Sequence, residues 1–80
     1  MKTEIFCSAI IKRNKIKFLY SLNEIVLDPY FITLEKSGKK VLYGRMMRSN
    51  EIKKFEYSHI SNIKVLKNAR FSPIIPIIAA

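Results

Sequence analysis

Residues 53–66 read Lys-Lys-Phe-Glu-Tyr-Ser-His-Ile-Ser-Asn-Ile-Lys-Val-Leu, and this stretch decides the fold. Phe55 and Tyr57 alternate with charged or polar neighbours, which is typical of a strand buried on one face. The pair Ser58-His59 interrupts the alternation, and from Ile60 the chain returns to apolar positions. Small barrels turn in this way, with a strand, a one-turn corner and another strand. The stretch therefore predicts a compact, mainly β module with a polar corner at His59.

The length and composition fit one small domain. The chain has 80 residues, of which 49% are hydrophobic, and it contains only two Gly and three Pro. These values favour a globular chain over a disordered one. A domain of this size buries only about 60–65% of its unfolded surface, so we expect self-association or a partner protein to add stability. We predict a single domain over residues 1–80, with residues 72–80 as an apolar extended tail that joins a second copy or covers the sheet.

The charge is strongly positive. Lys and Arg number 15 and Asp and Glu number 6, which gives a formal net charge of +9. Such an excess attracts polyanions, including nucleic acid and phosphorylated ligands. The alternative is that the charge only keeps a small surface solvated, and a charge count alone does not separate the two interpretations.

Several classes of function lack their motifs. One cysteine, Cys7, cannot form an internal disulfide, and with a single histidine, His59, it offers no credible metal site. Phosphate-binding glycine loops, a Ser-His-Asp set and paired carboxylates are also absent. We therefore expect a protein that is not an enzyme and has no cofactor. The sequence shows no signal peptide or transmembrane segment, so we expect a cytoplasmic protein with no membrane partner.

Hydrophobic periodicity predicts one helix followed by five strands. Asp28-Pro29 reverses the parity of the second strand, and proline cannot donate to a ladder, so we expect a sharp bend there. Turns are expected at Asn23-Glu24 and Ser37-Gly38. The fold class is thus mainly β (α+β), an N-terminal helix with a strongly bent, five-stranded antiparallel barrel of the SH3-like or Sm-like type. The expected helix spans residues 3–14, and the expected strands span residues 15–22, 25–34, 40–48, 51–57 and 62–67.

Five segments, in order, resemble the WYL domain of bacterial regulators. The first strand of that family has its counterpart in Ile16-Lys-Phe-Leu-Tyr20, and the strand that names the family resembles Gly38-Lys-Lys-Val-Leu-Tyr-Gly44. The other three are Val26-Leu-Asp-Pro-Tyr30, Lys53-Lys-Phe-Glu-Tyr-Ser-His-Ile60 and Phe71-Ser-Pro73. The resemblance covers nearly the whole chain and implies a domain that senses a ligand or nucleic acid and adjusts a DNA-binding neighbour.

The chain also departs from that family. Lys40-Val41 stands where the family has Trp-Tyr, so only Leu42 remains of the naming triplet, and His59 replaces an Arg. We expect a stand-alone version without a helix-turn-helix. The resemblance therefore does not imply the complete activity of a transcription factor for this chain.

The candidate ligand site combines aromatic rings with positive charges. Tyrosine rings stack on bases, and Arg and Lys neutralise phosphates. The alternatives are tyrosines at the edge of the core, a corner histidine that satisfies backbone groups, and an arginine that reaches solvent or a salt bridge. The predicted site residues are Tyr20, Tyr30, Arg45, Lys53 and His59.

These observations predict a regulatory module that binds an anionic ligand, either single-stranded nucleic acid or a phosphorylated small molecule. The alternative is a structural or interaction module that forms a homodimer or other oligomer, or docks on a partner protein, and has neither kind of ligand. The first requires basic residues and tyrosines on one face. The second requires an exposed apolar strip.

Overall fold

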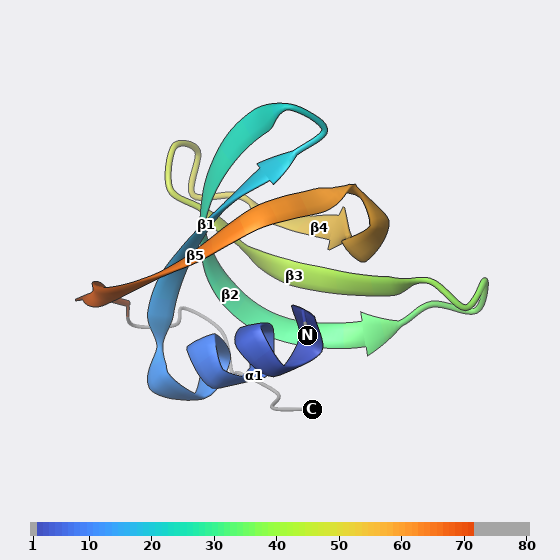
Figure 1. Cartoon of the computed structure of the whole chain (residues 1–80), viewed down its shortest axis with the longest axis horizontal. Helices are drawn as coiled ribbons and strands as arrows, with labels where there is room; N and C mark the ends of the chain where they lie inside the picture. Colours follow the sequence, from blue (N-terminus) through green and yellow to red (C-terminus); the bar gives the residue numbers. More distant parts are fainter. Residues whose placement is uncertain (1, 72–80) are drawn as a thin grey trace.

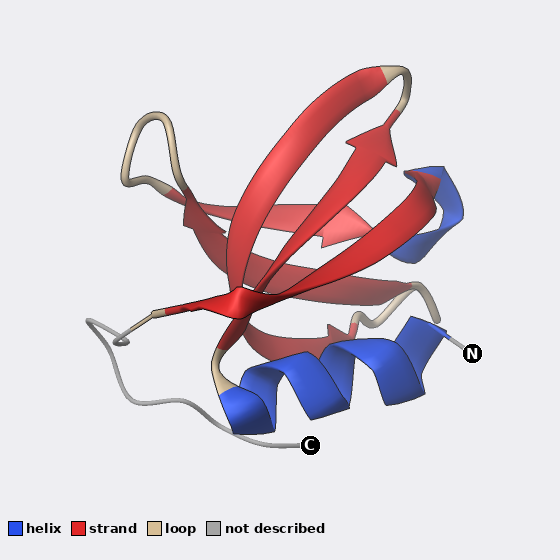
Figure 2. Ribbon diagram, turned by 60° about the vertical axis from the view of Figure 1, so that its left-hand side comes forward, coloured by secondary structure: helices blue, strands red, loops and turns tan. Residues whose placement is uncertain are grey.

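One helix and five strands make up the described part of the chain. The structure, a computed structural model, describes residues 2–71, with the backbone alone at residues 68 and 69. The predicted tail, residues 72–80, lies outside this range. Helix α1 packs against β1, β2 and β5 and covers one side of the curled sheet (Figures 1 and 2). The elements are α1 (Lys2–Lys12), β1 (Asn14–Tyr20), β2 (Asn23–Leu34), β3 (Lys40–Met46), β4 (Ile52–Glu56), a 3-10 turn (Tyr57–His59) and β5 (Ile60–Arg70).

The strands form one antiparallel sheet in the order β4-β3-β2-β1-β5. This arrangement confirms the predicted fold class, an N-terminal helix on a five-stranded, bent antiparallel sheet. The corner predicted at Ser58-His59 is the 3-10 turn, which reverses the chain between β4 and β5. Figure 1 shows β5 crossing back over the sheet to reach β1.

The bend in β2 lies at the predicted place. The first half of this strand pairs with β1 and its second half with β3, and the register to β3 shifts between Pro29 and Phe31. Gly44 of β3 is opposite Pro29, and a Cβ atom there would lie 2.5 Å from the carbonyl oxygen of Asp28 and 2.6 Å from the side chain of Leu27. Glycine is therefore required at this position because the two strands approach so closely.

The core fills the space between α1 and the inner face of the sheet. Phe6, Ala9 and Ile10 of α1 share one helix face and are buried. They meet alternate residues of the strands, as the two periodicities require. Phe18 packs edge-to-face on Phe55, with ring centroids 5.4 Å apart. The strand residues of the core are Ile16, Phe18, Leu27, Leu42, Phe55 and Ile60.

The first hairpin differs from the prediction. Tyr20 pairs with Asn23, so the turn consists of Ser21 and Leu22, where we expected Asn23-Glu24. Both turn residues have positive φ angles, 48° and 75°, as primed two-residue hairpin turns require. Leu22 lies at the tip of the hairpin and is 92% exposed.

The ends of α1 and β5 also differ from the prediction. The helix ends at Lys12 because Arg13 adopts the left-handed conformation, with φ 58°, that often closes helices. β5 is longer than the predicted segment and departs twice from regular pairing with β1. In the second departure, Lys15 pairs with Leu66 while Asn14 pairs with Arg70, so residues 67–69 bulge out of the ladder.

Candidate functional site

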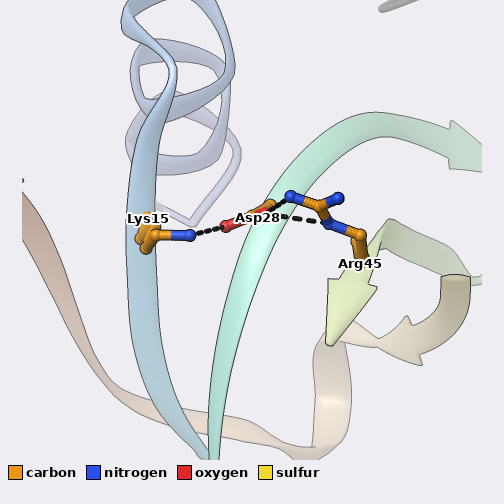
Figure 3. A network of polar contacts seen from close by, with 3 residues as sticks. All are labelled: Lys15, Asp28 and Arg45. Atoms are coloured by element: carbon orange, nitrogen blue, oxygen red, sulfur yellow. Dashed lines mark hydrogen bonds and ion pairs between the residues drawn. The ribbon is translucent and has the colours of Figure 1, made fainter. Parts of the chain in front are cut away.

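A buried carboxylate on the outer face of the sheet binds two cations from the neighbouring strands (Figure 3). Asp28 of β2 is only 1% exposed. Its Oδ1 accepts a hydrogen bond from Lys15 Nζ at 2.7 Å, and its Oδ2 accepts two from Arg45, from Nε at 3.1 Å and from Nη2 at 2.7 Å. These bonds raise the pKa of the Arg45 guanidinium above its ordinary value. The cluster thus joins β1, β2 and β3 by charge.

This cluster gives Arg45 a structural partner. A ligand role and a salt bridge are the two alternatives for Arg45, and the structure contains the salt bridge. Asp28 and Lys15 were not among the predicted site residues. The sequence contains a pattern that could have indicated Asp28. A cation on an apolar strand face, such as Arg45, requires a counter-charge, and Asp28 is an acidic residue at the predicted bend.

Tyr30 is fully buried, with 0% exposure. Its ring is nearly parallel to that of Phe71, with centroids 5.8 Å apart and an interplanar angle of 19°. A ring in this position cannot stack on a base while Phe71 covers it. We therefore leave Tyr30 out of the proposed site.

The corner brings Tyr20 and His59 together. Their ring centroids are 5.7 Å apart, and Tyr20 also packs edge-to-face on Phe55 at 4.9 Å. The Tyr20 hydroxyl accepts a hydrogen bond from the backbone N–H of Glu56. The His59 side chain is 52% exposed, and its Nε2 lies 4.0 Å from Glu56 Oε1. The neighbouring carboxylate makes this corner less favourable for an anion than the sequence suggested.

Lys53 lies apart from that pair. It is an exposed residue of the edge strand β4, where it pairs with Gly44. It lies two residues before Phe55 in that strand. Within residues 2–71 its side chain has no hydrogen bond or ion pair. The structure therefore brings Tyr20 and His59 together at the corner, whereas Lys53 lies on β4.

A groove between α1 and β5 is a better candidate site for an anionic ligand than the corner formed by Tyr20 and His59. Its volume is about 720 Å³. The bulge at residues 67–69 lies beside it, because Lys67 and Arg70 are both lining residues. Bulges are frequent next to binding sites, where they redirect side chains. The groove is lined by Glu4, Ile5, Ser8 and Lys12 of α1, Asn14 of β1, and Val65, Lys67 and Arg70 of β5.

The groove collects unpaired positive charge. Among the described residues, Lys12, Lys67 and Arg70 make no ion pair, whereas four of the carboxylates are paired with cations elsewhere. Glu4 is the one acidic side chain that lines the groove. Three cations face one carboxylate here, so the local charge favours an anion. The excess charge is evident in the sequence, but its location is not, because these residues come from the separate elements α1 and β5.

Asn14, a lining residue of the same groove, has a buried polar atom without a hydrogen-bond partner among the described residues. The residue is 5% exposed, and its Oδ1 is buried without a hydrogen-bond partner in the described part of the chain. An acceptor buried in this way costs about 1–3 kcal/mol. Folded proteins leave few such groups, and each requires an explanation.

The chain is similar in structure to part of a protein from Arthrobacter aurescens, proteasome accessory factor B/C (PafBC). The TM-score is 0.80 at 21% sequence identity, and the match covers 88% of this chain and 12% of PafBC. The chain thus spans a small part of that protein's length. At this identity the likeness concerns the fold alone, and it supports the WYL-like fold that the sequence motifs indicated.

No family model matches the sequence, and no curated protein matches it. Within residues 2–71, no group of three or more His, Cys, Asp or Glu side chains could hold a metal ion. The same residues include no helix with the length and apolar character needed to cross a membrane.

Proposed function

We propose that the chain is a regulatory module that binds an anionic ligand, either single-stranded nucleic acid or a phosphorylated small molecule. The observation that carries this proposal is the groove between α1 and β5, where Lys12, Lys67 and Arg70 stand unpaired. Its volume lies within the range of about 300–1,000 Å³ typical of ligand sites. The net charge of +9 adds long-range attraction for the same class of ligand.

Three of the predicted residues remain in the proposal as a second contact surface for a nucleic-acid strand. Tyr20 and His59 offer adjacent rings at the corner, and Lys53 offers an unpaired cation on β4. Arg45 is left out because its guanidinium is bound to Asp28. Tyr30 is left out because it is buried.

The test is fluorescence anisotropy with short single-stranded DNA and RNA at several salt concentrations. Each phosphate contact contributes about 0.7 to the slope of log K against log salt for a single strand. The triple variant Lys12→Ala/Lys67→Ala/Arg70→Ala should therefore weaken binding and reduce the slope by about 2. The change of Tyr20→Ala should cost about 1–3 kcal/mol of binding if that ring stacks on a base.

The matched control removes three exposed cations from other places. Lys36, Lys40 and Arg48 have no ion pair within the described residues and lie outside the groove. The variant Lys36→Ala/Lys40→Ala/Arg48→Ala has the same net charge as the groove variant and should bind nearly as well as the unchanged chain. Equal losses in the two variants would show that only the overall charge matters. Absence of any binding at low salt would refute the proposal.

The second candidate is an interaction module that oligomerises or docks on a partner protein. Large apolar side chains on the surface favour it, with Leu22 at 92%, Ile11 at 69% and Leu34 at 62% exposure. Ile11 lies in α1, Leu22 in the turn between β1 and β2, and Leu34 at the end of β2, so they do not form the strip along one strand that this function would require. Sedimentation of the full chain over a range of concentrations tests it. Association that the change Leu22→Ser abolishes would support this function over the first.

A further inference from the structure

A second hollow lined by lysines lies on β5, at the first of the two points where this strand departs from regular pairing with β1. It has a volume of about 440 Å³, and we call it the β1–β5 hollow; the residues that line it include Lys17, Leu19, Glu24, Asn62 and Lys64. The pairing shifts between Lys17 and Leu19, and Asn62, in the part of β5 that lies opposite, has a positive φ of 51°. Bulges redirect side chains and are frequent next to binding sites. Because the groove adjoins the second departure, each irregularity of β5 accompanies one hollow in the surface.

Two lysines of the β1–β5 hollow lie directly opposite each other. Lys17 pairs with Lys64, and Lys17 follows the core residue Ile16, so both lysine side chains lie on the outer face of the sheet. Like charges in this position destabilise the strand pair. Lys17 has Glu24 Oε2 at 3.8 Å, but both side chains of that ion pair are solvent-exposed, which weakens it, and Lys64 makes no ion pair within residues 2–71. An anion beside the two lysines would therefore relieve a repulsion that the described residues leave uncompensated.

The β1–β5 hollow and the groove share one strand, but their cations lie on different sides of it. Lys64 belongs to the outer face, whereas the groove is walled by α1, which packs on the inner face through Phe6 and Ile10. From Lys64 to Arg70 the strand advances six residues, at most about 20 Å. A phosphate group binds cations at about 2.7–2.9 Å and is too small to contact both places. β5 is the last strand in the sheet order, so within residues 2–71 one of its edges has no partner strand, and a longer ligand can cross that edge.

Resting on the proposed function, we propose that β5 binds a linear chain of phosphate groups in the groove and in the β1–β5 hollow at once. The chain contacts the cations of both places, which are Lys12, Lys67 and Arg70 in the groove and Lys17 and Lys64 in the hollow. Cations outnumber carboxylates in each, with Glu4 in the groove and Glu24 in the hollow. A chain that spans both places binds more tightly than either place alone allows, because its second contact is intramolecular. A nucleic-acid strand and inorganic polyphosphate both supply such a chain.

The experiment compares short and long phosphate chains by isothermal titration of the full chain at low salt. The short probes are tripolyphosphate and a thymidine trinucleotide, and the long probes are long-chain polyphosphate and a thymidine strand of twelve nucleotides. Such a strand is about 40 Å long even when its bases stack, so it reaches both places. With affinities expressed per phosphate, the long probes should bind at least about tenfold more tightly than the short ones.

The variant Lys17→Gln/Lys64→Gln removes the cations of the β1–β5 hollow and leaves the groove intact. It should lower the affinity for the long probes by at least about tenfold and reduce the salt slope of the twelve-nucleotide strand by about 1.4. The short probes should bind nearly as before, because the groove has the larger number of cations. The matched control, Lys36→Gln/Lys40→Gln, removes the same charge from exposed residues outside both places and should leave all four affinities nearly unchanged.

A second readout requires no ligand. Lys64→Gln alone removes the repulsion with Lys17 and keeps the ion pair between Lys17 and Glu24, so this variant should unfold at an equal or higher urea concentration. Because Lys64 is exposed, the single variant also replaces the double variant if that one fails to fold, and it should show the same selective loss for the long probes. A less stable Lys64→Gln would show that this ammonium group already has a stabilising partner, and would overturn the inference.

The outcomes separate this inference from the proposed function. Equal affinity per phosphate for short and long probes, or equal losses in the hollow variant and the control, would overturn binding across both places and leave the groove as an anion site. If none of the four probes binds, the proposed function fails as well. Where the long probes bind across both places, tighter binding of the thymidine strand assigns the ligand to nucleic acid. Tighter binding of polyphosphate assigns it to the inorganic chain.

Discussion

Replacing Arg45 by methionine tests whether the cluster around Asp28 holds the sheet together. Methionine keeps an unbranched stem and removes the guanidinium. Asp28, which is 1% exposed, would then retain, among the described residues, only the bond from Lys15 Nζ at 2.7 Å. Both hydrogen bonds to Oδ2, at 3.1 and 2.7 Å, would be lost.

The magnitude follows from the burial of the three groups. Removing one partner of a buried ion pair costs about 3–5 kcal/mol, because the other charge is left uncompensated. Lys15 remains, and the Arg45 side chain is 21% exposed, so we expect the lower end, about 3 kcal/mol. The total stability of such a domain is about 4–12 kcal/mol. A loss of this size should lower the melting temperature by about 12 °C or more.

The assay is urea unfolding of Arg45→Met, Asp28→Asn and the double variant, followed by far-ultraviolet circular dichroism. The double variant should be less destabilised than the sum of the two single variants by about 1–3 kcal/mol, because the groups interact directly. Lys53→Met is the control, since this exposed cation has no ion pair within residues 2–71 and its loss should change stability by less than about 0.5 kcal/mol. The reasoning fails if Arg45→Met unfolds at the same urea concentration as Lys53→Met, or if the two single effects simply add.

Three further predictions concern other parts of the fold. Gly44→Ala should destabilise the chain by about 2–3 kcal/mol in urea unfolding, because its Cβ would meet the Asp28 carbonyl oxygen, and an unchanged midpoint would contradict the close approach. Leu22→Gly should raise the free energy of unfolding by about 0.5–1 kcal/mol, since it relieves a φ of 75° in an exposed turn; lower stability would show that Leu22 packs on something. Burial raises the pKa of the Tyr57 hydroxyl, so the unfolded chain releases this proton first and stability should fall as the pH rises above about 10. Tyr57→Phe should flatten that fall when urea midpoints are compared at several alkaline pH values, and an unaltered slope would assign it to other groups.

Most of the architecture could be predicted because it depends on local patterns. Alternation marks the strands, and Pro29 marks the bend through its missing N–H. The first turn could not be predicted because its two positive φ angles fall on Ser21 and Leu22, where the sequence has no glycine. Because Tyr20 pairs with Asn23, only Ser21 and Leu22 are left to close the hairpin. A two-residue turn of this kind requires positive φ angles at both residues.

The site was harder to predict because it depends on register and on distant contacts. Arg45 meets Asp28 only because β2 and β3 pair in one particular register. Tyr30 is covered by Phe71, which is far from it in sequence. Lys67 and Arg70 of the groove flank the point where β5 leaves the regular ladder, and no local sequence pattern predicts a bulge of that length. Composition therefore predicted an anionic ligand, and the tertiary structure was needed to propose where it would bind.

The pairing of β1 with β5 has a consequence for the kinetics of folding. The hairpins β1–β2, β2–β3 and β3–β4 join neighbours in sequence and close short loops, whereas β1–β5 pairing joins strands near the two limits of the described chain. Closing such a long loop is entropically slow, and domains dominated by distant pairings fold in about milliseconds to seconds. The groove exists only once β5 has docked beside α1 and β1. The proposed ligand site is thus completed in the slowest assembly step, and a ligand bound there would favour the closed sheet over every partly folded form.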